Sequence, residues 1–267
     1  STNTDREIFR FGREGRGVCE FYYPFFLVNS FAYDSLIIYD SPAATLTKID
    51  LAALVESRDI AKCANSEHLY RNLNFMYNFN KVDSAFIGTF IEKDEGLFSF
   101  CNRNNGEIKN TDYVPYYFYE KGRKDAYCHH VLVSEKDNSI IVPFKYMNLI
   151  NCYDLDGNLK VTYALDWIKE EINTQIRVDE HTTVTFYRTY ATRNRCYLVW
   201  DGHKIEEELR KYPAKIVVMN WQGELEKVYQ LDNFADFIIP DEKQRMIYVG
   251  VYNAGLEFVE IYKYPML

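Results

Sequence analysis

Residues 184–231 have the sequence VTFYRTYATRNRCYLVWDGHKIEEELRKYPAKIVVMNWQGELEKVYQL, and this stretch decides the predicted fold. It contains four runs rich in β-branched and aromatic residues, which favour strands. The runs are Val184–Tyr190, Cys196–Trp200, Ile216–Asn220 and Leu225–Leu231. The last two flank Trp221-Gln222-Gly223-Glu224, where glycine supplies the positive φ of a tight hairpin turn. Four antiparallel strands in about fifty residues form the unit of a β-propeller blade.

The same unit recurs along the whole chain. Five strand-like runs each follow a polar turn cluster, and they begin at Leu36, Ala85, Ile140, Cys196 and Met246. These starting residues are roughly fifty residues apart, a period that is typical of β-propeller blades. Helical repeats do not fit so β-rich a sequence. The sequence therefore predicts an all-β propeller with five countable blades in a single domain spanning residues 1–267.

The two ends of the chain suggest how the predicted ring closes. The last repeat shows three strand-like runs, Ala235–Ile239, Met246–Val251 and Leu256–Tyr262. At the other end, Glu7–Gly12 is an isolated strand-like run without a hairpin partner nearby. We expect this N-terminal strand to complete the last blade, because it would cover an otherwise exposed sheet edge.

Composition excludes several classes of function. The chain has 31 basic and 39 acidic residues among 267, a net charge of −8, which argues against a nucleic-acid partner. No apolar run approaches the roughly 18 residues of a membrane-spanning helix. The six cysteines lack metal-site or disulfide-frame spacing, so we expect free, mostly buried thiols. Ser1–Arg6 lacks the pattern of a signal peptide, so the protein is cytosolic or its export signal was removed before Ser1.

One segment resembles a known family. Phe11–Phe21 has the sequence FGREGRGVCEF, and it is similar to the F-G-x-x-G-x-G-P-x-E-F motif of TolB-like six-bladed propeller proteins of gut-dwelling Bacteroidetes, with Val18 in place of the proline. Asp34–Ile37 and Thr47–Leu51 continue the likeness. The resemblance implies an exported lipoprotein of the periplasm or outer cell envelope with a binding or scaffold role, and it implies no catalytic residues. Members of this family usually carry a whole blade before this motif, whereas one predicted strand precedes it here. A shortened member and a self-closing five-bladed ring both remain open.

The predicted insertions gather on one face of the propeller. In a blade, the connections from second to third strand and from fourth strand to the next blade lie on the same face. The long segments are assigned to these connections: Ala52–Arg71, Tyr113–Ala126, Asp166–Thr182 and Asp201–Lys215. Leu51–Lys62 and Ile205–Lys211 are expected to be helical. Loops on a rigid scaffold concentrate binding residues, so this face is the predicted functional surface.

Two groups of residues are candidates for ligand binding. The first is an aromatic cluster in the Tyr113–Ala126 loop, where tyrosine rings could stack on a sugar or hold a peptide, or could instead fill the gap between two blades. The second consists of polar residues on predicted inner strands that could converge on a ligand. The candidate ligand-binding residues are Tyr116, Tyr117, Tyr119, His130, Arg188 and Asp236.

No motif for catalysis, metal or cofactor binding is recognised. A G-x-S-x-G elbow is absent, and His68, His181 and His203 lack metal-ligand spacing. Asp154–Asn158 is explained as a hairpin turn, and Gly12-x-x-Gly15-x-Gly17 precedes no helix and so is not a dinucleotide site. We therefore predict no cofactor and no metal. The first hypothesis is a binding or scaffold propeller for a carbohydrate, peptide or envelope protein, and the alternative is a channel-centred hydrolase or lyase.

Overall fold

The computed structural model describes residues 12–15, 17, 19–27, 35–90, 96–114, 127, 129–165, 178–207, 212–253 and 258–266. The chain divides into two compact units, Ser1–Asn110 and Thr111–Leu267. Regular structure in the described residues is β-strand apart from two short helices and one 3-10 turn. Neither of these helices has the length and apolar character needed to cross a bilayer. The prediction of an all-β chain is confirmed.

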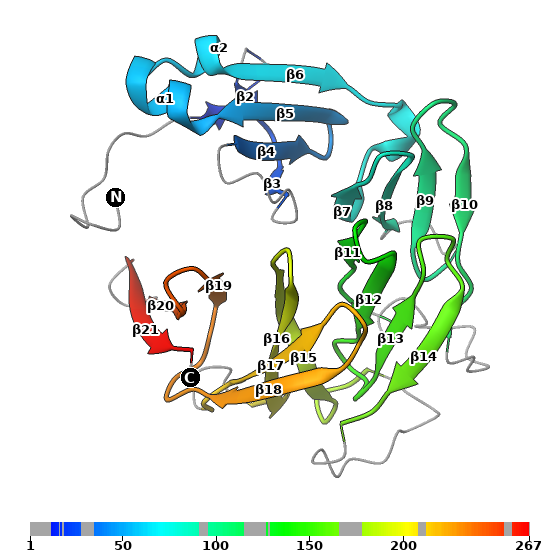
Figure 1. Cartoon of the computed structure of the whole chain (residues 1–267), viewed down its shortest axis with the longest axis vertical. Helices are drawn as coiled ribbons and strands as arrows, with labels where there is room; N and C mark the ends of the chain where they lie inside the picture. Colours follow the sequence, from blue (N-terminus) through cyan, green and yellow to red (C-terminus); the bar gives the residue numbers. More distant parts are fainter. Residues whose placement is uncertain are drawn as a thin grey trace. The chain divides into compact units, whose positions relative to one another are not determined.

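The first unit contains two four-stranded antiparallel sheets (Figure 1). The first sheet has the order β3 (Pro24–Phe26), β4 (Ser35–Asp40), β5 (Thr45–Asp50) and β6 (Ala64–His68). The second has the order β7 (Met76–Lys81), β8 (Ala85–Phe90), β9 (Ser99–Asn102) and β10 (Ile108–Asn110). A short parallel pair, β1 (Arg13–Glu14) and β2 (Glu20–Phe21), precedes them.

The second unit contains three further antiparallel sheets. The third sheet has the strands β11 (Leu132–Ser134), β12 (Ser139–Pro143), β13 (Ile150–Tyr153) and β14 (Leu159–Tyr163). The fourth has β15 (Thr183–Ala191), β16 (Arg195–Lys204), β17 (Lys215–Asn220) and β18 (Leu225–Gln230). The fifth has β19 (Phe237–Asp241), β20 (Met246–Asn253) and β21 (Phe258–Pro265).

The strand order confirms the repeat. In every sheet the strands follow one another in chain order, and the five runs predicted from the repeat are the second strands β4, β8, β12, β16 and β20. The hairpin turn between β17 and β18 has Gly223 at φ +87°, as its sequence predicted. Successive antiparallel meanders of this kind are the blades of a β-propeller. The five-blade prediction is therefore confirmed as a fold class.

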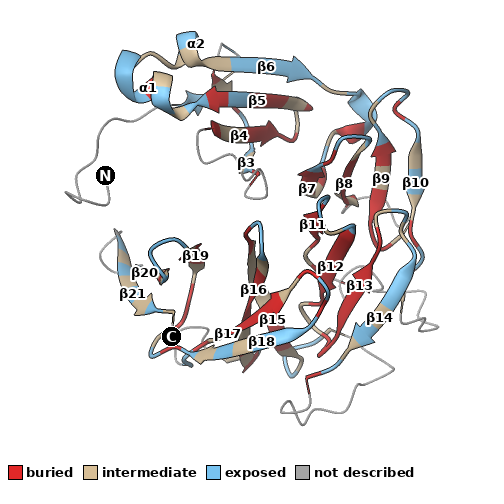
Figure 2. Cartoon of the chain, in the orientation of Figure 1, coloured by how far each residue is buried: buried red, intermediate tan, exposed pale blue. Residues whose placement is uncertain are grey.

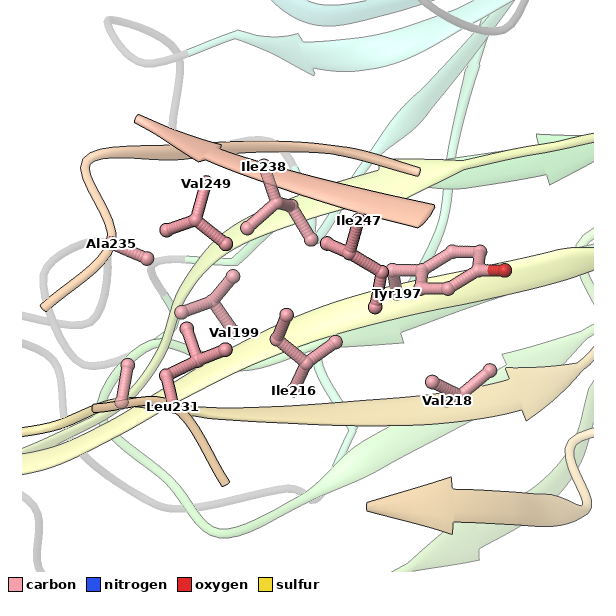
Figure 3. Packing of buried hydrophobic residues seen from close by; sticks show 10 residues of the cluster. Tyr197, Val199, Ile216, Val218, Leu231, Ala235, Ile238, Ile247 and Val249 are labelled. Atoms are coloured by element: carbon pink, nitrogen blue, oxygen red, sulfur yellow. The ribbon is translucent and has the colours of Figure 1, made fainter. Parts of the chain in front are cut away.

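Burial follows position within each sheet. In the third sheet β13 is wholly buried, whereas the outermost strand β14 is largely exposed (Figure 2). Neighbouring sheets of the second unit pack face to face, and Tyr197 and Val199 of β16 contact the cluster that contains Ile247 of β20 (Figure 3). Alternate residues of a strand point to one face, which explains why every second residue joins this core. Burial of these apolar side chains is the main stabilising term of the packed sheets.

The first unit is held together by an aromatic core. The rings of Tyr39 in β4 and Phe79 in β7 stack with centroids 4.1 Å apart, and Phe86 of β8 packs on Phe79 at 5.2 Å. The Tyr39 hydroxyl donates a hydrogen bond of 2.5 Å to the Leu73 carbonyl. The buried ring therefore has a partner for its polar end, and this core joins the first sheet to the second.

One long insertion connects a different pair of strands from the pair that the sequence predicted. The helices α1 (Leu51–Ser57) and α2 (Ile60–Cys63) confirm the helical expectation, but they connect β5 to β6, the third strand to the fourth. The prediction assigned Ala52–Arg71 to the other kind of connection. Residues 64–68, which form β6, are Ala-Asn-Ser-Glu-His, and they lack the β-branched and aromatic side chains that would have predicted a strand.

A second boundary also differs. The prediction ended the second strand of the fourth blade at Trp200 and began a loop at Asp201, whereas β16 continues to Lys204. The expected helix Ile205–Lys211 begins with turn residues, and its remainder lies outside the described residues. The fifth sheet has three strands in the described part of the chain. Of the predicted closing strand Glu7–Gly12, only Gly12 belongs to the described residues.

The described cysteines are free thiols, and all but Cys63 are buried. They are Cys19, Cys63, Cys101, Cys152 and Cys196.

Candidate functional site

Polar and charged side chains gather in the second unit where the first strand of each sheet begins and the second strand ends. We call them the inner-strand cluster. They come from the segment before β11, the segment after β12, the middle of β15, the end of β16 and the segment before β19. The cluster comprises His130, Lys145, Tyr187, Arg188, Asp201, His203 and Asp236.

Backbone hydrogen bonds fix the position of this cluster. The Thr185 N–H donates to the Lys145 carbonyl at 2.7 Å, and the Thr185 hydroxyl donates to the Phe144 carbonyl at 2.7 Å. The His130 N–H donates to the Pro143 carbonyl at 3.1 Å. The third and fourth sheets are thus joined at the point where Lys145 and His130 lie. A side chain on such a scaffold is preorganised, because its main chain has little freedom to move.

Two cations share one aromatic ring. The guanidinium carbon of Arg188 lies 4.0 Å from the ring centroid of Tyr187, and Nζ of Lys145 lies 5.2 Å from the same centroid. The ring attracts both cations, and Nζ of Lys145 also lies 4.9 Å from the ring centroid of Tyr146. Within the described residues neither cation forms a salt bridge with a carboxylate. Arg188 and Lys145 therefore lack a direct carboxylate contact in the described residues, although Asp201 and Asp236 belong to the same cluster.

The structure connects three residues named from the sequence. A ring nitrogen of His130, Nε2, lies 3.0 Å from the Tyr187 carbonyl, and Nε of Arg188 donates to the Asp236 carbonyl at 3.0 Å. The Asp236 carboxylate accepts a hydrogen bond of 2.6 Å from the Tyr252 N–H. His130, Arg188 and Asp236 are thus linked through main-chain groups rather than through direct contacts between their side chains. Tyr116, Tyr117 and Tyr119 lie outside the described residues.

The imidazole of His130 is uncharged at neutral pH. Burial lowers its pKa to about 4, and the nearby charges of Arg188 and Lys145 act in the same direction. Since Nε2 faces a carbonyl oxygen, it carries the proton, and His130 acts here as a neutral hydrogen-bond donor. Its neighbour His129 points its Nδ1 at the Tyr127 carbonyl at 2.5 Å, and burial lowers its pKa to about 4 as well.

The sequence interpretation missed Asp201 and His203, which lie at a β-bulge. The pairing of β15 with β16 shifts register between Val184 and Phe186, and the extra residues on β16 fall around Gly202. Gly202 has φ +70°, and a Cβ there would lie 2.0 Å from the Trp200 ring, so only glycine fits. Bulges of this kind redirect side chains and occur beside functional sites.

Asp201 and His203 are buried without hydrogen-bond partners. Each side chain is 1% exposed, and Nδ1 of His203 lies 3.9 Å from Oδ2 of Asp201, beyond hydrogen-bond distance. In the part of the chain that the structure describes, neither the carboxyl oxygens nor the ring nitrogens have another partner. Buried polar groups are nearly always satisfied by protein, water or ligand. The pair is therefore a place where a bound molecule would gain hydrogen bonds.

Burial also changes the ionisation of this pair. It raises the pKa of Asp201 to about 7, and it outweighs the opposing attraction of Arg188 and Lys145. Burial lowers the pKa of His203, opposed by Glu207. Near neutral pH the Asp201 carboxyl therefore exists in both protonation states while His203 is neutral. A strand that contains glycine and then histidine is the one signal that could have indicated the bulge, because an isolated glycine in a strand suggests one.

The described residues contain no group of three or more His, Cys, Asp or Glu side chains placed to hold a metal ion. The chemistry that the cluster offers instead is attraction of a negative group by Arg188 and Lys145, an aromatic surface at Tyr187, and hydrogen bonding at the buried Asp201–His203 pair.

Comparisons with known proteins support the fold. No protein-family model and no curated protein sequence matches the chain. The chain is similar to the crystal structure of a member of the DUF4221 family from Bacteroides vulgatus, with 12% identity, a TM-score of 0.52, and coverage of 92% of this chain and 80% of that one. It is also similar to a virginiamycin B lyase from Staphylococcus aureus, with 11% identity, a TM-score of 0.40 and coverage of 90% and 69%. The Pan2 WD40 domain of Neurospora crassa gives 8% identity, a TM-score of 0.47 and coverage of 90% and 61%. The similarity to the Bacteroides vulgatus structure agrees with a β-propeller fold and concerns the fold alone.

Proposed function

We propose that the protein is a binding scaffold whose inner-strand cluster takes an acidic segment of a peptide or protein partner. The observation that carries this proposal is the pair of cations, Arg188 and Lys145, which lie at 4.0 and 5.2 Å from the Tyr187 ring and form no salt bridge in the described part of the chain. Cations that are held in place but not neutralised favour binding of an anion.

The residue types suit a protein partner. An arginine fork binds a carboxylate through two parallel hydrogen bonds, and tyrosine and arginine are enriched among the residues that dominate protein–protein affinity. The long segments Tyr113–Ala126 and Asp166–Thr182 connect to the strands that bear the cluster. In this proposal the tyrosines Tyr116, Tyr117 and Tyr119 of the first segment add aromatic contacts around the acidic group. A neutral carbohydrate would make no use of the charge of these two cations, which contact no carboxylate in the described residues.

The experiment is a peptide array with matched acidic and amide sequences. Asp and Glu peptides are spotted beside the same peptides with Asn and Gln, and the protein is tested as wild type and as Lys145→Gln/Arg188→Gln. We expect wild type to prefer the acidic member of each binding pair and the double variant to lose that preference. Arg193→Gln and Lys136→Gln are the matched controls, because both residues are exposed and outside the cluster. Equal binding of acidic and amide peptides by wild type would refute the proposal.

We also propose a cellular location. The resemblance of Phe11–Phe21 to TolB-like six-bladed propellers supports an exported envelope lipoprotein in the periplasm or outer cell envelope, acting as one domain. Fractionation of the native cells, with metabolic labelling by a fatty acid, tests this directly. Recovery of the protein with the labelled envelope fraction is the expected result, and recovery in the cytosol without label would contradict it.

A second candidate function has its own observation. Asp201 and His203 form a buried acid–imidazole pair at 3.9 Å, and Arg188 and Lys145 act electrostatically on Asp201. This arrangement suits a channel-centred hydrolase or lyase better than a purely passive surface. The two functions differ in the effect of Asp201→Asn. An enzyme would lose turnover of chromogenic esters or glycosides while still binding them, whereas a binding scaffold shows no turnover in either form.

A further inference from the structure

The first unit contains a pocket of about 820 Å³ that the inner-strand cluster does not include. This volume falls within the range of roughly 300–1,000 Å³ that holds small ligands. One wall is the β1–β2 segment, with Gly15, Gly17 and Glu20–Tyr22. The other wall is formed by residues of β5 and β6 in the first sheet. The pocket therefore lies entirely inside one compact unit.

The sheet wall presents hydroxyl groups. Thr45 pairs with His68 and Thr47 pairs with Ser66 across β5 and β6. Directly paired residues and alternate residues share one face, so these four side chains lie on the same side of the sheet. The Thr47 and Ser66 hydroxyls lie 2.8 Å apart and form a hydrogen bond. Hydroxyl and imidazole groups both donate and accept hydrogen bonds, which suits a ligand that carries hydroxyls itself.

The loop wall is fixed by two carboxylates. The Gly17 N–H donates to Oε2 of Glu20 at 2.6 Å, and Arg13 pairs with the other oxygen. A Cβ at Gly15 would lie 2.1 Å from Oε2 of Glu20, so the loop closes around this carboxylate only because residue 15 is glycine. The Asp40 carboxylate accepts from the Tyr22 and Tyr23 N–H groups at 2.9 and 3.0 Å. The Glu20 carboxylate therefore fixes the shape of the loop itself, and the Asp40 carboxylate of β4 holds the loop against the sheet.

We infer that this pocket binds a neutral carbohydrate. The described lining offers no lysine or arginine to an anionic ligand, and Arg13 is already paired with Glu20. The second carboxylate, Asp40, already accepts two main-chain hydrogen bonds. The described lining therefore presents mainly hydroxyl and apolar groups to a ligand. Tyr22 lines the pocket and is 41% exposed, which leaves apolar ring surface for the C–H face of a sugar. The hydroxyls of Thr45, Thr47 and Ser66 supply partners for sugar hydroxyls, whose burial without partners is costly. This inference does not rest on the function proposed for the second unit.

Isothermal titration of the full chain with neutral hexaoses of glucose, mannose and xylose tests the inference, with an oligogalacturonate as the acidic comparison. We expect at least one neutral oligosaccharide to bind more tightly than the acidic one. Tyr22→Ala should weaken that binding by about tenfold, the loss expected for one aromatic contact. Ser66→Ala should also weaken it, and it provides a second test if Tyr22→Ala does not fold.

Matched controls come from neighbouring residues. Tyr23 is 56% exposed and does not line the pocket, and Glu67 lies on the opposite face of β6 from Ser66. Tyr23→Ala and Glu67→Ala should bind like wild type, and Arg188→Gln should too, which separates this pocket from the inner-strand cluster. The inference is overturned if no neutral oligosaccharide binds at millimolar concentration, if the acidic one binds better, or if Tyr23→Ala and Tyr22→Ala have equal effects.

Discussion

The guanidinium of Arg188 in β15 donates a hydrogen bond of 3.0 Å to the main-chain carbonyl of Asp236, 48 residues further along the chain. The same guanidinium lies over the Tyr187 ring. One side chain therefore joins the fourth sheet to the segment that leads into the fifth, and it also faces the proposed binding site. Nε makes the bond to the Asp236 segment, whereas the two terminal nitrogens donate to the Tyr187 carbonyl at 3.5 Å and to the Tyr187 hydroxyl at 3.2 Å.

Replacement of Arg188 by methionine should destabilise the fold. The change keeps much of the apolar volume but removes a charged donor, which is worth about 1–2 kcal/mol in the free energy of unfolding. Urea denaturation followed by circular dichroism measures this as a lower midpoint with an unchanged slope. Arg193→Met at an exposed position is the control. Equal midpoints for the two variants would show that the Asp236 hydrogen bond contributes nothing.

Stability should depend on pH through Asp201. Its folded pKa of about 7 lies above the value of about 3.9 expected in the unfolded chain, so the folded state binds the proton more tightly. The contribution of Asp201 to the free energy of unfolding is complete below pH 4. It is lost as the pH rises to 7, and the loss is at most about 4 kcal/mol. Asp201→Asn cannot ionise, so its stability relative to wild type should rise between pH 4 and 7 and then level off. Urea denaturation at each pH gives the free energy of unfolding of both proteins. If the two plots of this free energy against pH are parallel, the Asp201 carboxyl is not buried without a partner.

Alanine at Gly202 should be costly. The new Cβ would meet the Trp200 ring at 2.0 Å and would also occupy a left-handed conformation at φ +70°. Steric overlap and backbone strain together predict a loss of about 2–4 kcal/mol. Gly157→Ala is the matched control, because Gly157 also has positive φ, at +86°, but lies in a hairpin turn. The bulge interpretation requires Gly202→Ala to be the more damaging of the two in thermal unfolding, and the reverse order would refute it.

Pairing of Glu7–Gly12 with the last blade stays a prediction. In the described residues β21 pairs with β20 on one side, and an additional strand would cover its other edge. Deletion of residues 1–11 should lower Tm by at least about 5 °C, since backbone pairing and apolar burial are both lost. Deletion of residues 1–5 leaves the predicted strand intact and should have little effect. If both truncated chains have the same Tm as the full chain, the N-terminal segment does not close the sheet.

The sequence predicted the sheets well because the signal was strong and repeated. Residues such as Cys196–Val199 combine β-branched, aromatic and apolar side chains after a turn, and all five such runs are second strands of their sheets. Strand β6 was missed because Ala64–His68 is mostly polar, and its residues do not alternate between apolar and polar as a half-buried strand would. Its pairing depends on β5, which a local pattern does not reveal.

The site was predictable only in part. Arg188, His130 and Asp236 were named because they are polar residues on predicted inner strands, and the structure links them by hydrogen bonds to main-chain carbonyls. Lys145 and Tyr187 were not named, because their proximity depends on packing between two sheets. Asp201 was assigned to a loop, since Asp-Gly is a common turn pair and the bulge that buries it arises from long-range strand pairing.

The most direct test of the proposed function is a double-mutant cycle between the cation pair and an acidic peptide selected from the array. Titration calorimetry gives Kd for wild type and Arg188→Gln, each with the peptide and with its Glu→Gln or Asp→Asn form. If Arg188 binds the peptide carboxylate, the coupling energy should be about 1.5 kcal/mol or more, the value of a close charge pair at an interface. Strictly additive effects, with no coupling between Arg188 and the peptide carboxylate, would contradict it.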